Sequence, residues 1–146
     1  MIWREATRVD VPAVVALLAD DVLGHGRESA DPAPYLAAFD AMQEEGGNRL
    51  IVAEQDGRVV ACYQLTLISG LSLTAARRAQ VEGVRVAADL RGRGLGAALM
   101  ADAEARARAA GCQLIQLTTN ATRTDAHRFY ARLGFTPSHI GFKKPL

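Results

Sequence analysis

Apolar residues recur along the chain with two periods, and their alternation predicts strands and helices. Short runs rich in Val, Ile and Leu predict six strands, at residues 2–6, 50–54, 59–68, 79–86, 112–118 and 135–143. Apolar residues spaced three or four apart predict four helices, around residues 11–22, 35–42, 95–110 and 124–133. Strands and helices in this order are typical of an α/β fold with one mixed sheet and helices on its faces.

The connections indicate how these strands pair. Asp56-Gly57 lies in a polar turn between two β-rich runs and predicts a hairpin. Residues 50–86 are therefore expected to form an antiparallel meander of three strands. The strand at 112–118 follows the strand at 79–86 after a single helix, so these two are expected to be parallel neighbours joined by a right-handed crossover.

Length and composition set the class of protein. The 146 residues are enough for one domain, 1–146, and 49% hydrophobic with 23% charged residues is ordinary for a soluble globular protein. A net charge of +1 gives no reason to expect nucleic acid or a membrane as partner. The first residues form no apolar leader and no apolar run reaches 18 residues, so a cytoplasmic protein is expected.

Cysteine and histidine add little chemistry. Cys62 and Cys112 each lie in a strand-like apolar run and are expected to be buried free thiols, ahead of a disulfide or a nucleophile. His25, His127 and His139 are far apart in the sequence, so no metal site is predicted.

The stretch 81–96 carries the most specific chemistry. Val84 and Val86 share one face of a predicted strand, and a glycine-rich turn then leads into an alanine-rich helix. Glycines at 92, 94 and 96 let an anion approach the free N–H groups of the helix start, and Arg91 and Arg93 add positive charge. The spacing fits neither a P-loop nor a dinucleotide fingerprint. On this motif alone, a purely structural turn stays open.

Three motifs together resemble one family. Arg91-x-x-Gly94-x-Gly96 after a Val-rich strand resembles the acetyl-CoA signature of the GCN5-related N-acetyltransferase (GNAT) superfamily. The opening Ile2-x-Arg4-Glu5-Ala6-Thr7-x-x-Asp10 is similar to the first strand and helix entry of that family, and Phe129-Tyr130-x-x-x-Gly134-Phe135 to its C-terminal motif. The resemblance covers the whole chain. It implies the GNAT fold, with a mixed sheet of six to seven strands and about four helices, and acetyl-CoA as cosubstrate.

The resemblance also implies which residues hold the cosubstrate. In this family the backbone of the key strand binds the pantetheine amides, the amides of the turn bind the pyrophosphate, and an Asn just after the next strand contacts the pantetheine arm or orders a water. The corresponding residues here are Val84, Arg85, Val86, Arg91, Gly92, Arg93, Gly94, Leu95, Gly96, Ala97 and Asn120, with Tyr130 close to the thioester.

Two side chains are the catalytic candidates. The resemblance points to Tyr130 as the acid that protonates the leaving sulfur, and a phenol with an ordinary pKa of about 10 is protonated at neutral pH. A core tyrosine is the alternative. Glu82 stands at the position many relatives use, often through water, to take the ammonium proton, with structural ion pairing as the competing interpretation. Glu82 has the parity of Val84 and Val86, unless a bulge, which Gly83 favours, changes the count.

The sequence says least about the acceptor amine and the residues that bind it. Residues 117–130, with Ser138-His139, resemble the same region of aminoalkylphosphonate acetyltransferases, which places Arg123 and His127 near the acceptor, although a surface role for both stays open. The polar loop 24–32, with His25, is either a substrate lip or a plain connection, and Tyr35 is one candidate for an aromatic wall.

The expected function is transfer of an acetyl group to the primary amine of a small molecule, by direct attack in a ternary complex. A non-catalytic acyl-CoA-binding or sensing module and a protein or peptide N-acetyltransferase are the alternatives. A homodimer is a further expectation, because dimers are common among similar proteins.

Overall fold

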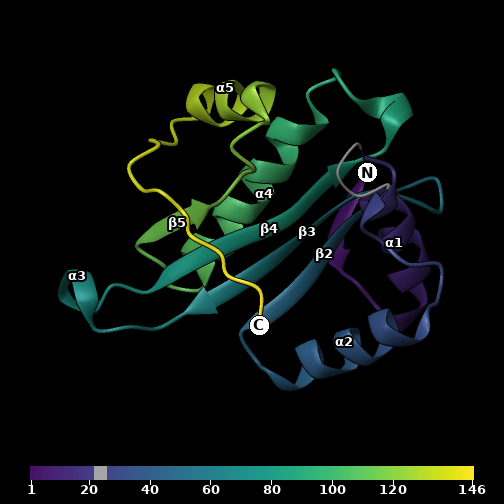
Figure 1. Ribbon diagram of the computed structural model, residues 1–146, viewed down its shortest axis with the longest axis horizontal. Helices are drawn as coiled ribbons and strands as arrows, with labels where there is room; N and C mark the ends of the chain where they lie inside the picture. Colours follow the sequence, from purple (N-terminus) through teal and green to yellow (C-terminus); the bar gives the residue numbers. More distant parts are fainter. Residues whose placement is uncertain (22–25) are drawn as a thin grey trace.

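The computed structural model describes residues 1–21 and 26–146, and a five-stranded sheet forms its centre (Figure 1). The strand order along the sheet is β1-β2-β3-β4-β5. The first three pairings are antiparallel and the pairing of β4 with β5 is parallel, which confirms the predicted meander and crossover. The strands are β1 (Ile2–Glu5), β2 (Asn48–Gln55), β3 (Arg58–Ile68), β4 (Arg78–Val86) and β5 (Leu114–Leu117).

Helices cover the two faces of this sheet. The short 3-10 turns are η1 (Arg8–Asp10) and η3 (Ala88–Leu90), and the helices are α1 (Val11–Ala19), α2 (Ala33–Glu44), α3 (Ser72–Ala75), α4 (Leu95–Ala109) and α5 (Thr124–Arg132). The Tyr63 hydroxyl donates to Asp102 of α4 at 2.5 Å, whereas the preceding residue of the strand, Cys62, points to the opposite face of the sheet. Figure 1 shows α1 and α2 on the side of the sheet away from α4, and α3 projecting beyond the body.

The core lies on both faces of the middle strands, against α4 on one side and against α1 and α2 on the other. Its largest fully buried side chains include Tyr63, Ile51, Leu65, Leu99 and Met100. The buried Tyr63 hydroxyl is satisfied by Asp102, which also accepts from Arg106 at 2.8 Å. No helix in the described part of the chain is long and apolar enough to cross a membrane.

The entry of α1 follows its sequence signals. Pro12 occupies the first turn of the helix and Asp10 precedes it. The Asp10 carboxylate accepts from Arg4 at 2.7 and 2.9 Å and from the Thr7 backbone N–H at 2.7 Å. These hydrogen bonds, with the one from Arg4 first, lower the pKa of Asp10 to about 2. Arg4 also donates to Glu54 of β2, so one guanidinium joins β1, β2 and the start of α1.

The expected number of strands is too high. The sheet has five strands rather than six to seven, because residues 135–143, expected to be a strand, have no regular structure. Within the described residues that segment has no neighbouring strand to complete a ladder, and a strand needs such a partner. The expected number of about four helices agrees with the described residues, which contain the four predicted helices and the additional four-residue α3.

The cysteines differ from each other. Cys62 is a buried free thiol in β3, as predicted, and burial raises the pKa of its thiol to about 12. Cys112 is also free but half-buried, and it precedes β5 instead of lying inside it.

Candidate active site

Strands β4 and β5 separate halfway along β4, and this separation organises the site. Their parallel pairing begins at Arg78 with Leu114 and ends at Val81 with Leu117. Strand β4 continues to Val86 with β3 on one side only. Beyond Val81 the second edge of β4 is therefore partly open to a ligand that binds in an extended form. The Val84 and Val86 carbonyls accept from the Arg85 and Arg91 side chains at 2.8 and 3.1 Å.

A bulge in β4 coincides with this separation. Cys62 pairs with Arg85 and Gln64 with Glu82, so β4 contains one residue more than β3 between these pairs. Gly83 lies in the extra segment with φ +59°, a conformation that favours glycine. The bulge expected at Gly83 is confirmed.

The bulge also changes which side chains share a face. Because Cys62 and Gln64 point to the same side of β3, their partners Arg85 and Glu82 do too. The expectation that Glu82 shares a face with Val84 and Val86 is therefore wrong. Glu82 is exposed, whereas both valines are half-buried and pack against the core.

The turn after β4 is shaped for an anion. Gly92 and Gly94 have φ of +75° and +81°, which glycine tolerates best. A Cβ atom on either would meet nothing within 4 Å, so these positions require glycine for conformation and not for space. α4 begins at Leu95, and its first turn has no acidic residue. Its free N–H groups and dipole favour a negatively charged group here.

A cavity of about 420 Å³ lies over this turn. Six predicted cosubstrate-binding residues line it, together with four that the sequence did not single out: Val86, Arg91, Gly92, Gly94, Gly96 and Ala97, with Leu90, Phe129, Arg132 and Leu133. The added residues come mainly from α5. A Cβ atom on Gly96 would lie 3.2 Å from the Phe129 ring, so Gly96 lets α5 pack closely on α4.

The arginines of the turn are held differently. Arg91 donates to the Val86 carbonyl at 3.1 Å and to the Asp20 carbonyl at 2.9 Å. Its guanidinium thus joins the end of α1 to the end of β4. Arg93 is exposed and Leu95 is buried, so Leu95 offers a ligand only its backbone.

The phenol of Tyr130 lies half-buried on α5. Its ring contacts Phe129 and Phe135 edge-on, with centroids 5.0 and 5.8 Å away. Burial raises its pKa, while the positive charges of Arg123 and Arg85 act in the opposite direction. Because the net shift of the pKa is upward, the phenol stays protonated at neutral pH.

Glu82 is the first residue of β4 beyond the last pair with β5. Its carboxylate accepts from the Gln80 amide at 2.5 Å, and Gln80 in turn accepts from the Gln116 amide at 2.9 Å. This chain of hydrogen bonds crosses from β5 to β4 and fixes the carboxylate at the mouth of the separation.

A cluster of charges lies beside Tyr130, and only one of its members was expected near the acceptor. Asp21, after the end of α1, is 2.8 Å from Arg85 and 3.6 Å from Arg123. The Asp21 and Arg85 side chains are each 11% exposed, and Arg123 is 40% exposed. Burial lowers the pKa of Arg85 and the charge of Asp21 opposes that shift. Two guanidiniums thus share one carboxylate.

The remaining predicted residues have local partners. The Asn120 side chain accepts from the Thr122 backbone at 3.0 Å, and His127 contacts the Asn120 carbonyl at 3.0 Å. Tyr35 accepts from the Ser29 backbone at 2.8 Å. His25 lies outside the described residues. No group of His, Cys, Asp and Glu suited to a metal ion occurs in residues 1–21 and 26–146.

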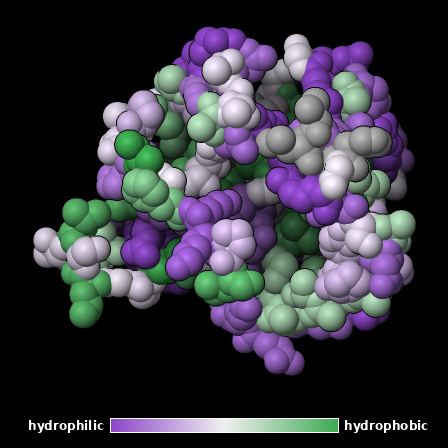
Figure 2. Space-filling view, in the orientation of Figure 1, coloured by the Kyte–Doolittle hydropathy of each residue, from purple (hydrophilic) through white to green (hydrophobic). Residues whose placement is uncertain are grey.

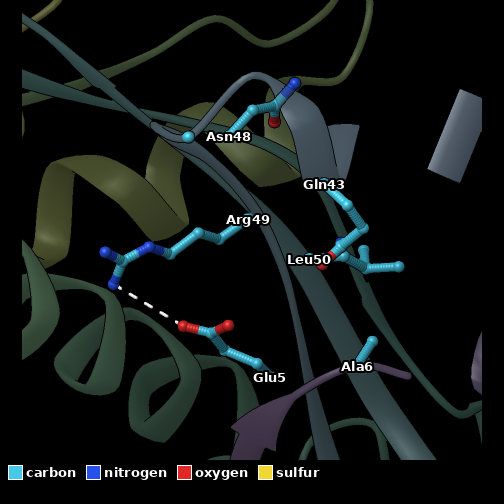
Figure 3. Close-up of a pocket in the computed structure, with 7 residues that line it drawn as sticks. Glu5, Ala6, Gln43, Asn48, Arg49 and Leu50 are labelled. Carbon is cyan, nitrogen blue, oxygen red and sulfur yellow. Dashed lines mark ion pairs between the residues drawn. The ribbon is translucent and has the colours of Figure 1, made fainter. Parts of the chain in front are cut away.

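A second hollow, of about 210 Å³, lies at the start of β2, away from these groups (Figure 3). Arg49 and Glu5 face each other across it at 3.6 Å, and the Asn48 side chain points away from that pair. The two charges cancel, and no predicted site residue lines the hollow.

Comparison with known proteins gives consistent matches. Residues 13–135 match the model of the acetyltransferase (GNAT) family. An aminoalkylphosphonate N-acetyltransferase from Salmonella typhimurium is 33% identical over 143 residues, which cover 98% of this chain and 90% of that protein. Among solved structures, a transcriptional regulator from Bacillus halodurans is 42% identical with a TM-score of 0.95 over 99% of both chains. A putative acetyltransferase from Agrobacterium tumefaciens is 28% identical, with a TM-score of 0.89 over 100% of both chains.

Proposed function

The chain belongs to the acetyltransferase (GNAT) family and is an N-acetyltransferase, and we propose that it acetylates the primary amine of a small, anionic molecule at the expense of acetyl-CoA. The observation that carries this proposal is the pair of guanidiniums, Arg85 and Arg123, that share the single carboxylate of Asp21 beside Tyr130. These three side chains, taken together, carry one positive charge in excess, and the two arginines act on the pKa of the proposed acid.

The cavity over the glycine turn suits acetyl-CoA. Gly92 and Gly94 expose backbone N–H groups, and Arg91 and Arg132 line the walls with positive charge, which complements a pyrophosphate. Residues 84–86 on the open side of β4 would hold the pantetheine amides. When bound, the cosubstrate supplies the acetyl group as a thioester.

Tyr130 is proposed to hold the proton that the departing sulfur needs. Its raised pKa keeps the phenol protonated at neutral pH, and no hydrogen bond occupies its hydroxyl within the described residues. A positioned acid of this kind contributes about 10²–10⁴-fold to a proton-transfer step.

Glu82 is proposed to take the proton of the acceptor ammonium through a water molecule, so that the amine reacts in its neutral form. The carboxylate is exposed at the mouth of the β4–β5 separation and held there by Gln80. The amine can then attack the thioester directly in a ternary complex, while open N–H groups of β4 donate to the carbonyl oxygen.

The charge cluster is proposed to bind the acid group of the acceptor. Arg123 is the more exposed guanidinium, and its contact with Asp21 is long, at 3.6 Å, so it can turn toward a phosphonate or carboxylate. The name of the Salmonella relative agrees with an amine that carries a phosphonate. Aminoalkylphosphonates are therefore the first acceptors to try.

The test is release of free thiol from acetyl-CoA with matched acceptors. We expect 2-aminoethylphosphonate to be acetylated at least ~10-fold more efficiently than propylamine, which lacks the acid group; charge-assisted hydrogen bonds of about 1.5–3 kcal/mol predict such a ratio. Equal efficiencies would contradict the anionic acceptor. Binding of acetyl-CoA without thiol release against any amine, including peptides, would contradict the proposed small-molecule activity.

A further inference from the structure

Three polar side chains form a row on one face of the sheet where β4 and β5 separate. Gln80 of β4 lies opposite Gln116 of β5, one pair before the last pair of these strands. Glu82 is two residues further along β4, so its side chain lies on the same face as that of Gln80. Gln80 and Gln116 are half-buried and Glu82 is exposed. Figure 2 shows hydrophilic surface near the middle of the molecule, where Figure 1 labels β3 and β4. The row therefore leads from the paired part of the sheet to its open edge.

The chemistry of the row allows only one direction for its hydrogen bonds. A carboxylate only accepts, so the Gln80 amide has to present its nitrogen to Glu82, and the distance from Nε2 to Oε1 is 2.5 Å. The oxygen of the same amide then needs a donor, which Gln116 supplies from its Nε2 at 2.9 Å. A reversed Gln80 amide would set oxygen against oxygen at Glu82 and N–H against N–H at Gln116. Gln116 therefore fixes the orientation of the amide that holds Glu82.

The row leaves one oxygen of Glu82 free for chemistry. Gln80 occupies Oε1, and within residues 1–21 and 26–146 the Glu82 carboxylate makes no other hydrogen bond or ion pair. Arg85 lies on the same face of β4 but pairs with Asp21, at 2.8 Å. Oε2 is therefore the oxygen that can accept a proton, while the carboxylate is held in place through Oε1.

We propose that Gln80, oriented by Gln116, is a positioning residue that aims Oε2 of Glu82 at the acceptor amine. The inference rests on the proposed role of Glu82 as the base and names the residues through which that base is held. A bridging water gives a proton to Oε2 and takes one from the ammonium, which leaves the amine neutral and its lone pair free to attack the thioester. An exposed glutamate samples several rotamers, and a hydrogen bond from a half-buried amide restricts it to those that suit this transfer.

A second glutamine beside Glu82 provides the matched control. Gln64 lies directly opposite Glu82 on β3, on the same face of the sheet, and it too is half-buried. Its amide donates to Asn48 of β2 at 2.8 Å, so its N–H group points to β2 rather than to the carboxylate. Gln64→Met therefore removes the same chemical group from the same neighbourhood without removing a hydrogen bond of the base.

The first test compares two acceptors that differ in their need for a base. The ammonium group of 2-aminoethylphosphonate has to lose a proton before it attacks. In (aminooxy)methylphosphonate an oxygen replaces the carbon next to the nitrogen, and that nitrogen is already neutral at neutral pH. We expect Gln80→Met to lower kcat/KM about 10-fold for the amine, a part of the roughly 10²–10⁴-fold that a positioned base contributes, and to leave the aminooxy compound nearly unchanged. Gln116→Met should act in the same direction to a smaller degree, and Gln64→Met should leave the ratio of the two acceptors unchanged.

The ratio of the two acceptors separates positioning from structure. A merely structural loss would lower kcat/KM for both acceptors by the same factor. That result, or a ratio that Gln80→Met leaves unaltered, would overturn the inference while the acetyltransferase activity of the natural chain stands. Where the thiol-release assay favours another amine, the same comparison is made with that amine and its aminooxy isostere. A natural chain that releases thiol with no amine would overturn the proposed function, and this inference with it.

The second test needs no acceptor, because it detects the hydrogen bonds themselves by NMR. The side-chain amide protons of Gln80 should change their chemical shift in Glu82→Ala and in Gln116→Met, since each variant removes one partner of that amide. The side-chain amide protons of Gln64 should move less, because their partner is Asn48. Gln80 resonances that neither variant moves would overturn the row of hydrogen bonds and the positioning role that depends on it.

Discussion

The two ends of the active site are built in opposite ways. The proposed cosubstrate end comes mainly from one continuous stretch, 86–97, to which α5 adds cavity-lining residues, and its turn is shaped by backbone geometry, as the positive φ of Gly92 and Gly94 shows. The proposed acceptor end brings Asp21, Arg85 and Arg123 together from three segments that are distant in the sequence, and it would act through side-chain charge. A ligand shared by a whole family can be held by backbone, whereas a variable acceptor is best selected by side chains that substitution can change.

The largest effect is expected at Tyr130, the proposed acid, where a substitution should lower kcat without changing the binding of acetyl-CoA. Tyr130→Phe removes the hydroxyl but keeps the ring contacts with Phe129 and Phe135. We expect kcat to fall by about 10²–10⁴-fold, with the Kd of acetyl-CoA unchanged by calorimetry. Unchanged kcat would assign Tyr130 to the core alone.

The second effect compares one ion pair from each end. Arg85→Met leaves Asp21, which is 11% exposed, without its nearest cation, and should lower the free energy of unfolding by about 3 kcal/mol. Arg91→Met removes only exposed contacts, a pair with Asp20 at 3.7 Å and hydrogen bonds to the Val86 and Asp20 carbonyls, and should cost less, about 1 kcal/mol. Urea denaturation measures both. Equal losses would mean that the two ends rely on side-chain charge to the same degree.

A third effect tests a buried pair outside both ends. The pKa of Asp10, about 2 in the folded protein and 3.8 ordinarily, is lowered first by the Arg4 hydrogen bond. Its stabilisation is therefore present above pH 4 and lost as the pH falls toward 2. We expect about 2 kcal/mol between these limits. Urea curves of the natural chain and Asp10→Asn should converge near pH 2; a constant difference would contradict the linkage.

The smallest effect tests the backbone character of the cosubstrate end. Gly94→Ala places a Cβ in a left-handed conformation at a cost of about 1–2 kcal/mol, which predicts roughly 10-fold weaker binding of acetyl-CoA. Gly141→Ala is the control, because that position has ordinary φ and open space. If both variants bind acetyl-CoA equally, the left-handed conformation at Gly94 does not contribute to the binding of acetyl-CoA.

The difference between a site made of consecutive residues and a site made of distant ones explains what could be predicted from the sequence. Residues 81–96 follow one another, so their strand, glycine turn and helix could be predicted from local pattern, as could the bulge at Gly83. The face of β4 on which Glu82 lies could not be predicted, because it depends on where the extra residue of the bulge is placed opposite β3.

Features made by distant contacts were missed. Asp21 was not predicted as a site residue, because only folding brings the end of α1 next to Arg85. Phe129, Arg132 and Leu133 line the cavity with Leu90 because α5 packs over the glycine turn. Phe129 belonged to the C-terminal motif, but nothing in the local sequence indicated that α5 would reach this turn. The strand at 135–143 was predicted from its own residues, but a strand also needs a neighbour.

The most direct test of the central claim measures how Arg123 discriminates between acceptors. The ratio of kcat/KM for 2-aminoethylphosphonate to that for propylamine is determined in the natural chain, in Arg123→Gln and in Arg128→Gln, whose arginine lies on the exposed side of α5. The account predicts that Arg123→Gln lowers this ratio by about 10-fold or more while Arg128→Gln leaves it unchanged. A ratio that Arg123→Gln does not alter would contradict the proposal that the charge cluster selects the acceptor.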